Sequence, residues 1–468
     1  MLPRSTASTS ARNGVGDQRD GGCVDVYAID SMAACGGGPF LWLTCPTGLE
    51  YSVVQECIRL LDVTPESIDS HRGRVVVTPF PARLMDAPSL IWSFRSIENA
   101  LYGVCRVSSD AFLHASEGVA LAAVKDTVAS VVGSSWADAL DQWRRTPVSG
   151  TNPRTFNVVA GPTPTYYVTR KRGGRHSFAS VDLGRQVWAG MDPIVPWEAV
   201  IGLDNADVEI HSHLHEAELA LGVRLHAESH WKRSGVLKEN RQWASTPLKP
   251  NICAGLLAET QLQSGDVFVD PMGGCGTLAE VAVECHPGKV FCIVGDVLGE
   301  VAAKAHHNKA GQHGNVTDAM IDVVMWDSSN LPLRDGCINK VCSDLPFGRR
   351  CGSKTDNRRL YPLFCLELAR VLAKDGMAAL LSADRKSLPL AVNQAAGAMP
   401  FFKKQRHFTV NVGGLDAITF VLKKRYYAAK RGPSVRSGKV TTSSSSKKKR
   451  RVEATDDAKE SSKPAAMQ

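Results

Sequence analysis

The stretch Asp270-Pro-Met-Gly-Gly-Cys-Gly-Thr277 decides the fold of this chain. It follows a short apolar run, Val267-Phe-Val269, and leads into a helical pattern. Glycines at a strand-to-helix turn let backbone N–H groups approach a ligand closely, because no Cβ stands in the way. The sequence therefore predicts a cofactor-binding turn at the end of a strand, although nucleotide-binding proteins of several classes share this logic.

Outward from this turn, apolar runs alternate with helical patterns. Uninterrupted apolar strands between helices are typical of a parallel sheet that is covered on both faces. Residues 408–422 read as two antiparallel strands joined at Gly413-Gly414. We therefore predict an α/β, Rossmann-like domain at 240–425 that ends in a hairpin. Its predicted strands are 267–269, 290–295, 321–325, 338–342 and 376–382, and its predicted helices are 276–285, 299–310, 360–373 and 386–397.

A second motif, Ser343-Asp-Leu-Pro-Phe-Gly348, follows the predicted strand Ile338-Asn-Lys-Val-Cys342. It places an acid, a proline and an aromatic residue at one strand tip. With the glycine turn, it resembles the two loops of S-adenosylmethionine-dependent methyltransferases that modify an exocyclic amino group of a nucleobase. The resemblance implies the seven-stranded class I methyltransferase sheet and S-adenosyl-L-methionine as cofactor.

Acidic residues end three successive predicted strands, and the ends of such strands meet in one crevice. Each acid alone would suit a helix cap, but three in order indicate a binding site. Asp270 is expected to accept a hydrogen bond from the amine of the cofactor, and Asp296 is expected to accept hydrogen bonds from its ribose hydroxyls. Asp327 or Ser328 is expected to accept a hydrogen bond from its adenine amino group. The predicted cofactor-binding residues are Asp270, Pro271, Met272, Gly274, Gly276, Thr277, Asp296, Asp327 and Ser328.

The second motif suits a target amino group such as N2 of guanine, whose lone pair is delocalised into the ring. The Asp344 carboxylate and the Leu345 carbonyl are predicted to accept its two hydrogens, while Pro346 fixes the turn. Phe347 is predicted to stack on the base, a contact worth about 1–3 kcal/mol. The rate gain would come mainly from proximity and in-line geometry, with Asp344 accepting a proton as charge develops.

Leu345 stands where the common Asp/Asn-Pro-Pro-Tyr/Phe loop has its first proline. The loop Asp344-Leu-Pro-Phe-Gly348 resembles the corresponding loop of eukaryotic THUMP-containing guanine-N2 methyltransferases. Three further segments resemble the same family: Arg349-Arg-Cys-Gly-Ser-Lys354, Leu360-Tyr-Pro362 and Asn411-Val-Gly-Gly-Leu-Asp-Ala417. The chain departs at Met272-Gly-Gly-Cys-Gly276, where the family usually has Met-Cys-Gly-Thr/Ser-Gly, but both core glycines remain. The resemblance implies N2-methylation of a guanosine in the tRNA acceptor-stem region, or in a U6-type small nuclear RNA. It also implies a small zinc-containing activator subunit as partner.

The N-terminal half reads as α+β structure. Residues 23–110 show a β-α-β-α order, with a strand that ends in a turn at 40–49, a strand at 74–78 and helices at 50–61 and 93–104, which suggests a ferredoxin-like domain. Residues 111–230 show a helical stretch at 116–143, a strand at 166–169, a basic turn at 170–178, a helix at 181–191 and a hairpin at 206–225. This block resembles a THUMP domain, which implies RNA contacts by Lys171, Arg172, Arg175 and His176; a purely structural turn is the alternative.

Further basic and histidine residues lie near these motifs. Basic side chains after the catalytic strand are predicted to hold RNA phosphates beside a flipped base, although a surface loop can be basic by chance. They are Arg349, Arg350, Lys354, Arg358 and Arg359.

His211, His213 and His215 would share one face of a strand, but no cysteine accompanies them, so we predict no metal site.

Composition sets the outer limits. A chain of 468 residues is too long for one compact core, so two or three domains are expected. No run of 18 uncharged apolar residues is present, so no membrane span is expected. The 13 cysteines form no Cys-x-x-Cys pair, which argues for a reducing compartment and against a zinc ribbon.

The ends of the chain read as disordered. Residues 1–22 form a polar leader. Residues 431–468 hold ten Lys/Arg and four Asp/Glu, so this tail supplies +6 of the net charge of +8. Its run Lys447-Lys-Lys-Arg-Arg451 is either a nuclear signal or an RNA-binding tail, so we expect a cytoplasmic or nuclear protein.

Three alternatives stay open. An N6-adenine methyltransferase uses the same loop chemistry, although the THUMP-like block argues against it. A protein glutamine methyltransferase usually has Asn-Pro-Pro-Tyr, which is absent. A catalytically inactive RNA-binding scaffold is the third, and the intact Asp344, Pro346, Phe347 and glycines count against it.

Overall fold

The computed structural model describes residues 38–131, 133–148, 163–226, 232, 234, 236–237, 241–243, 247–310, 320–348, 353–397 and 401–425. The predicted leader at 1–22 and the predicted tail at 431–468 lie outside these residues, as do Arg349 and Arg350.

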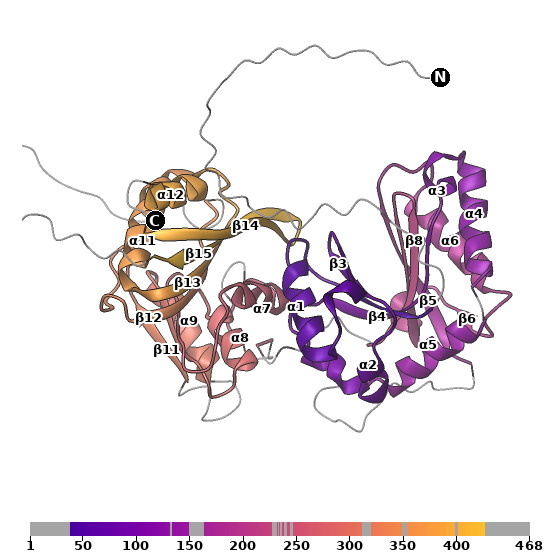
Figure 1. The fold of residues 1–468 in the computed structure, drawn as a ribbon, viewed down its shortest axis with the longest axis horizontal. Helices are drawn as coiled ribbons and strands as arrows, with labels where there is room; N and C mark the ends of the chain where they lie inside the picture. Colours follow the sequence, from indigo (N-terminus) through magenta and orange to yellow (C-terminus); the bar gives the residue numbers. More distant parts are fainter. Residues whose placement is uncertain are drawn as a thin grey trace, which may run out of the picture. The chain divides into compact units, whose positions relative to one another are not determined.

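Two sheets organise the described part of the chain (Figure 1). The first sheet has the order β2-β3-β1-β4-β8-β7-β5-β6. Its strands are β1 (Phe40–Thr44), β2 (Ile68–His71), β3 (Arg74–Val77), β4 (Asn99–Ser108), β5 (Thr165–Gly173), β6 (Glu198–Ala199), β7 (Val208–His215) and β8 (Glu218–Arg224). The helices around it are α1 (Glu50–Leu61), α2 (Ala82–Asp86), α3 (Ala111–His114), α4 (Glu117–Ala129), α5 (Gly133–Arg145) and α6 (Ser180–Met191), with short 3-10 turns at Pro65–Ser67, Pro88–Ser93 and Leu203–Asn205.

Strand β4 joins the two segments that were predicted to be separate α+β domains. It pairs antiparallel with β1 on one side and with β8 on the other, so strands from 23–110 and from 111–230 share one sheet. The predicted helix at 93–104 is wrong, because a 3-10 turn ends at Ser93 and β4 begins at Asn99. The apolar spacing of Ile97, Leu101 and Val104 imitates a helix, but pairing along both edges of β4 decides its conformation.

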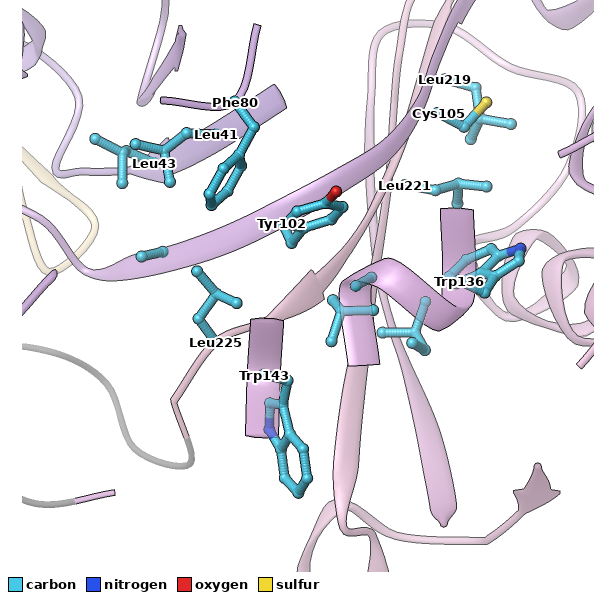
Figure 2. Packing of buried hydrophobic residues seen from close by; sticks show 14 of the residues in the cluster. Leu41, Leu43, Phe80, Tyr102, Cys105, Trp136, Trp143, Leu219, Leu221 and Leu225 are labelled. Atoms are coloured by element: carbon cyan, nitrogen blue, oxygen red, sulfur yellow. The ribbon is translucent and has the colours of Figure 1, made fainter. Parts of the chain in front are cut away.

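The core of the first sheet lies on the face that carries the helices. Leu41 and Leu43 of β1 point into it, together with Tyr102 of β4 and the buried Trp136 of α5 (Figure 2). Side chains alternate along a strand, so Trp42 lies on the other face, where it packs in a small apolar group with Phe40, Val76, Leu101 and Ala220.

The second sheet has the order β11-β10-β9-β12-β13-β15-β14. Strands β9 to β13 run parallel, and β15 and β14 form an antiparallel hairpin at the edge, as predicted. The strands are β9 (Val267–Asp270), β10 (Phe291–Asp296), β11 (Ile321–Met325), β12 (Ile338–Asp344), β13 (Leu372–Ser382), β14 (Phe402–Val412) and β15 (Leu415–Lys424), and the helices are α7 (Pro250–Glu259), α8 (Thr277–Cys285), α9 (Gly299–Ala310), α11 (Lys354–Val371) and α12 (Ser387–Gly397).

Helices cover both faces of the second sheet. Phe268 and Cys342 pack in one apolar cluster with residues of α7, α8 and α9. Their neighbours Val269 and Val341 pack in another with residues of α11 and α12. This arrangement confirms the predicted doubly wound α/β fold.

Helix α11 begins at Lys354, six residues before the predicted start at 360. The Ser353 hydroxyl accepts a hydrogen bond from the Asp356 amide (3.1 Å), and the Asp356 carboxylate accepts from the Ser353 amide (3.0 Å). This capping box fixes the start of the helix. No described helix is both long and apolar enough to cross a membrane.

Candidate active site

Three carboxylates meet at the carboxyl edge of the second sheet. Asp270, Asp296 and Asp344 are the last residues of β9, β10 and β12, and β9 lies between the other two strands. The Gly274 amide donates to Asp296 Oδ2 (3.2 Å), and the Ser343 hydroxyl donates to Asp270 Oδ1 (2.8 Å). The structure therefore brings the predicted cofactor turn and the predicted catalytic turn to neighbouring strands.

The glycine turn is shaped for close approach. Gly274 and Gly276 have φ of +55° and +87°, which favour glycine, and a Cβ added at Gly274 would meet nothing within 4 Å. The Pro271 carbonyl accepts from the Trp326 indole N–H (3.0 Å), which ties the turn to the residue after β11. An open backbone surface beside carboxylates fits the ribose and amine of an S-adenosylmethionine-type cofactor.

Asp270 is buried beneath this turn. Its Oδ1 accepts from Ser343 and, at 3.4 Å, from the Met272 amide. Burial raises the pKa of Asp270 to about 7, with a smaller contribution from the charge on Asp296, while the two hydrogen bonds oppose the rise. The carboxyl is therefore poised to ionise when a cationic ligand arrives.

Asp344 carries the feature most suggestive of a ligand. The residue as a whole is partly exposed, but its Oδ1 is buried and has no hydrogen-bond partner among the described residues. Burial, and secondarily the charge on Asp270, holds the pKa of Asp344 well above its ordinary value. A buried acceptor without a donor is costly unless a ligand N–H supplies one.

The rest of the catalytic turn is held on both sides. The Leu345 amide donates to the Leu381 carbonyl (2.9 Å), and the Leu345 side chain is buried. The Pro346 carbonyl accepts from Asn357 Nδ2 (2.9 Å) and from the Tyr361 hydroxyl (2.5 Å). Asn357 and Tyr361 were not predicted as site residues, and the only signal for them was the Leu360-Tyr-Pro362 motif. Phe347 is partly buried against the α7–α8 apolar cluster.

Asp327 and Ser328 lie in the loop after β11. Asp327 is exposed, and its Oδ1 accepts from the Ser329 amide and hydroxyl, both at 2.8 Å. Ser328 is buried. Both residues thus follow the carboxyl end of β11, and the adenine contact stays a prediction, since one Asp327 oxygen already stabilises its own turn.

A segment before the second sheet also contacts the glycine turn. The buried Arg241 guanidinium pairs with Glu280 of α8 and donates to Thr277 Oγ1 (3.0 Å) and to the Cys275 carbonyl (3.3 Å). Asn308 of α9 donates to the same carbonyl (3.0 Å). Sequence reasoning missed Arg241 and Asn308, because nothing near them in the chain indicates these contacts.

The predicted RNA contacts of the first sheet divide into two kinds. Lys171 and Arg172 belong to β5 and not to a turn, which corrects the prediction. Lys171 and Arg175 are exposed, whereas Arg172 Nη1 donates to the His176 carbonyl (3.3 Å) and His176 Nε2 contacts the Glu216 carbonyl (2.9 Å). Burial, and then the charge of Arg172, lowers the pKa of His176. Of the four predicted RNA contacts, only Lys171 and Arg175 are therefore exposed.

Other predicted basic residues lie near the catalytic turn in sequence. Lys354, Arg358 and Arg359 are exposed on the first turns of α11, which starts shortly after that turn. Arg349 and Arg350 lie outside the described residues.

The three histidines of β7 do share one face. His213 stacks on Trp42 at 6.1 Å, and burial, followed by the charge of Arg74, lowers its pKa to about 3. His211 Nε2 lies 2.9 Å from Glu209 Oε1. Within the described residues, no group of three or more His, Cys, Asp and Glu is arranged to hold a metal ion.

Comparisons with known proteins agree with this geometry. Residues 239–417 match the family model of the RMKL-like methyltransferase domain. The tRNA (guanine(6)-N(2))-methyltransferase THUMP3 of Homo sapiens is 31% identical over 311 residues, which is 64% of this chain and 57% of that protein. The U6 snRNA (guanine-N(2))-methyltransferase THUMPD2 of Bos taurus is 26% identical over 51% of this chain and 44% of that protein. The chain thus spans little more than half the length of the first relative and less than half the length of the second.

Among solved structures, TrmN from Thermus thermophilus superposes with a TM-score of 0.60 at 19% identity, covering 82% of this chain and 99% of that one. The fold is therefore that of the class I methyltransferases. Residues 239–417 are thus similar to the RMKL-like methyltransferase domain, and the predicted resemblance to eukaryotic THUMP-containing guanine-N2 methyltransferases is confirmed.

Proposed function

We propose that this chain transfers a methyl group to N2 of a guanosine in RNA, with tRNA as the substrate and its acceptor-stem region as the target. The observation that carries the proposal is the buried Oδ1 of Asp344, which lacks a donor at the tip of β12 beside the glycine turn. An exocyclic amino group supplies the missing N–H.

The residues of the chain would share the work as follows. Asp270, Asp296 and the backbone around Gly274 hold S-adenosylmethionine, which supplies an electrophilic methyl group. Asp344 Oδ1 and the Leu345 carbonyl accept the two hydrogens of N2, which aims its lone pair. Asp344 then takes up the proton that N2 loses, and burial, which raises the pKa of this carboxyl, makes it a stronger base.

The relatives favour tRNA over a small nuclear RNA. The tRNA-methylating relative is the more identical and matches more of the chain, at 31% over 64% against 26% over 51%. A U6-type RNA is the second candidate. Lys171, Arg175 and Lys354 are exposed cations that suit phosphate contacts in either RNA.

The THUMP-like segment would dock the RNA and act as a ruler for the methyltransferase domain at 240–425. A small zinc-containing activator subunit would form a heterodimer with the chain. The run Lys447–Arg451 would direct it to the nucleus or bind RNA; these residues lie outside the structure's described part.

The test is tritiated-methyl transfer from S-adenosylmethionine to total tRNA and to a U6 transcript, with and without the activator subunit, followed by nucleoside analysis. We expect N2-methylguanosine in the tRNA pool. Label in U6 alone would select the second candidate. Methyladenosine would indicate the N6 alternative, and cofactor binding without any transfer would indicate the inactive scaffold.

A further inference from the structure

The Pro346 carbonyl oxygen is saturated by two side chains of one helix. Asn357 Nδ2 donates to it at 2.9 Å and the Tyr361 hydroxyl at 2.5 Å. Both residues lie on α11, one turn apart, and are 1% and 0% exposed. Two buried side chains directed at one backbone oxygen fix the orientation of that peptide group.

These two donors are themselves anchored at the end of β13. The Tyr361 hydroxyl also meets Ser382 Oγ (2.8 Å), and Asn357 Nδ2 also contacts Asp384 Oδ2 (3.2 Å). Asp384 Oδ1 in turn accepts from the Ser387 amide (3.0 Å) at the start of α12. The network therefore joins the catalytic turn to the strand beside it and to two helices.

The turn is also pressed against the start of α11. Gly348 has φ of +67°, and a Cβ added there would lie 2.9 Å from the Lys354 amide nitrogen and 3.0 Å from Asn357 Nδ2. At this distance a larger residue would displace Asn357.

The consequence falls on the neighbouring peptide. The Leu345 amide is fixed by Leu381, and the residue before a proline is restricted to extended conformations. With the Pro346 carbonyl also fixed, the Leu345 carbonyl and the Asp344 carboxylate have little freedom to change direction. These are the two groups that would hold the target amino group.

We propose that Tyr361 and Asn357 are positioning residues that aim Asp344 and the Leu345 carbonyl at the amino group. This inference depends on the proposed function, and neither residue needs to touch RNA or cofactor. A misplacement of about 1 Å at a reacting group costs on the order of 100-fold in rate. Loss of the Tyr361 hydroxyl is therefore expected to slow methyl transfer by roughly 10- to 100-fold.

The experiment compares the unsubstituted chain with Tyr361→Phe and Asn357→Ala, together with the activator subunit. Single-turnover methyl transfer is measured at saturating S-adenosylmethionine and tRNA, alongside calorimetric affinity for S-adenosylhomocysteine and thermal denaturation. Tyr166→Phe is the matched control, because it removes a hydroxyl from a buried tyrosine of β5, a strand of the first sheet.

We expect both variants to lose single-turnover rate while cofactor affinity and melting temperature stay near those of Tyr166→Phe. Tyr361→Phe with unchanged rate would overturn the inference. So would a rate loss matched by an equal loss of cofactor affinity or of folding in both variants, because the residues would then be structural only. Absence of transfer by the unsubstituted chain would instead overturn the proposed function, and this inference with it.

Discussion

The Ser343 hydroxyl donates a hydrogen bond to Asp270 Oδ1 over 2.8 Å. This bond joins the strand that ends in the catalytic turn to the strand that ends in the glycine turn. Asp344, the next residue, is thereby held at a fixed position relative to the cofactor site. The two carboxyls also influence one another, since the charge on Asp270 adds to the raised pKa of Asp344.

Cofactor affinity should increase with pH. Burial raises the pKa of Asp270 to about 7, so below this pH the carboxyl is largely protonated. A cationic cofactor favours the ionised form, so binding releases a proton and affinity rises as pH rises, by up to about tenfold per pH unit. Calorimetry with S-adenosylmethionine between about pH 6 and pH 8 measures this trend.

Asp270→Asn should flatten the pH dependence of cofactor affinity. The same measurement on Asp344→Asn shows how much the Asp344 carboxyl contributes to that dependence. Equal cofactor affinity at every pH would show that Asp270 does not ionise on binding.

The raised pKa of Asp270 also affects folding stability. The stability that Asp270 contributes is complete below the unfolded-state pKa of about 4 and is lost as pH rises through about 7.

Gly274→Ala should abolish cofactor binding and should cost no more folding stability than the same change at Gly265. Both Gly274 and Gly265 have positive φ and open space where a Cβ would stand. Each alanine should therefore cost about 1–2 kcal/mol of stability through backbone strain. Only Gly274 faces the cofactor site, so Gly265→Ala is the matched control. Retained affinity in Gly274→Ala would remove this turn from the cofactor site.

Arg241→Met should destabilise the methyltransferase domain. The variant leaves the buried Glu280 carboxylate without the Arg241 guanidinium, and breaking a buried ion pair from one side costs about 3–5 kcal/mol. The double variant Arg241→Met/Glu280→Leu should recover much of this loss in urea denaturation. A single variant as stable as the unsubstituted chain would show that the pair contributes little.

Lys171→Ala and Arg175→Ala should weaken RNA binding and leave cofactor affinity unchanged. Each removes one exposed cation, so each should lower the salt dependence of binding by about one unit of slope. Lys125→Ala removes an exposed cation from α4 and serves as the control. RNA affinity that is equal in all three variants would place the RNA elsewhere.

Local patterns predicted the methyltransferase domain because its strands are continuous apolar runs with acids at their tips. The hairpin at residues 408–422 was predicted from its glycine pair. Gly413 and Gly414 both have the positive φ that such a turn requires. Helix α7 was not predicted, because it is buried nearly all round and has no polar stripe to reveal its period.

The missed parts depend on contacts that are distant in the chain. Strand β4 owes its conformation to β1 and β8, and its paired residues in β8 are at least 110 positions away in sequence. The donors to Pro346 come from Asn357 and Tyr361, and the donor to Thr277 comes from Arg241. Nothing in a local pattern links such pairs, so the supporting residues of the site became visible only in the structure.

The central claim is that Asp344 holds the target amino group of guanosine. The most direct test is methyl transfer from S-adenosylmethionine to tRNA by the unsubstituted chain and by Asp344→Asn, with nucleoside analysis and cofactor affinity measured on both. We predict N2-methylguanosine from the unsubstituted chain and a rate reduced by about 10²- to 10⁴-fold in the variant, with cofactor binding preserved. Comparable N2-methylguanosine formation by Asp344→Asn would contradict the account.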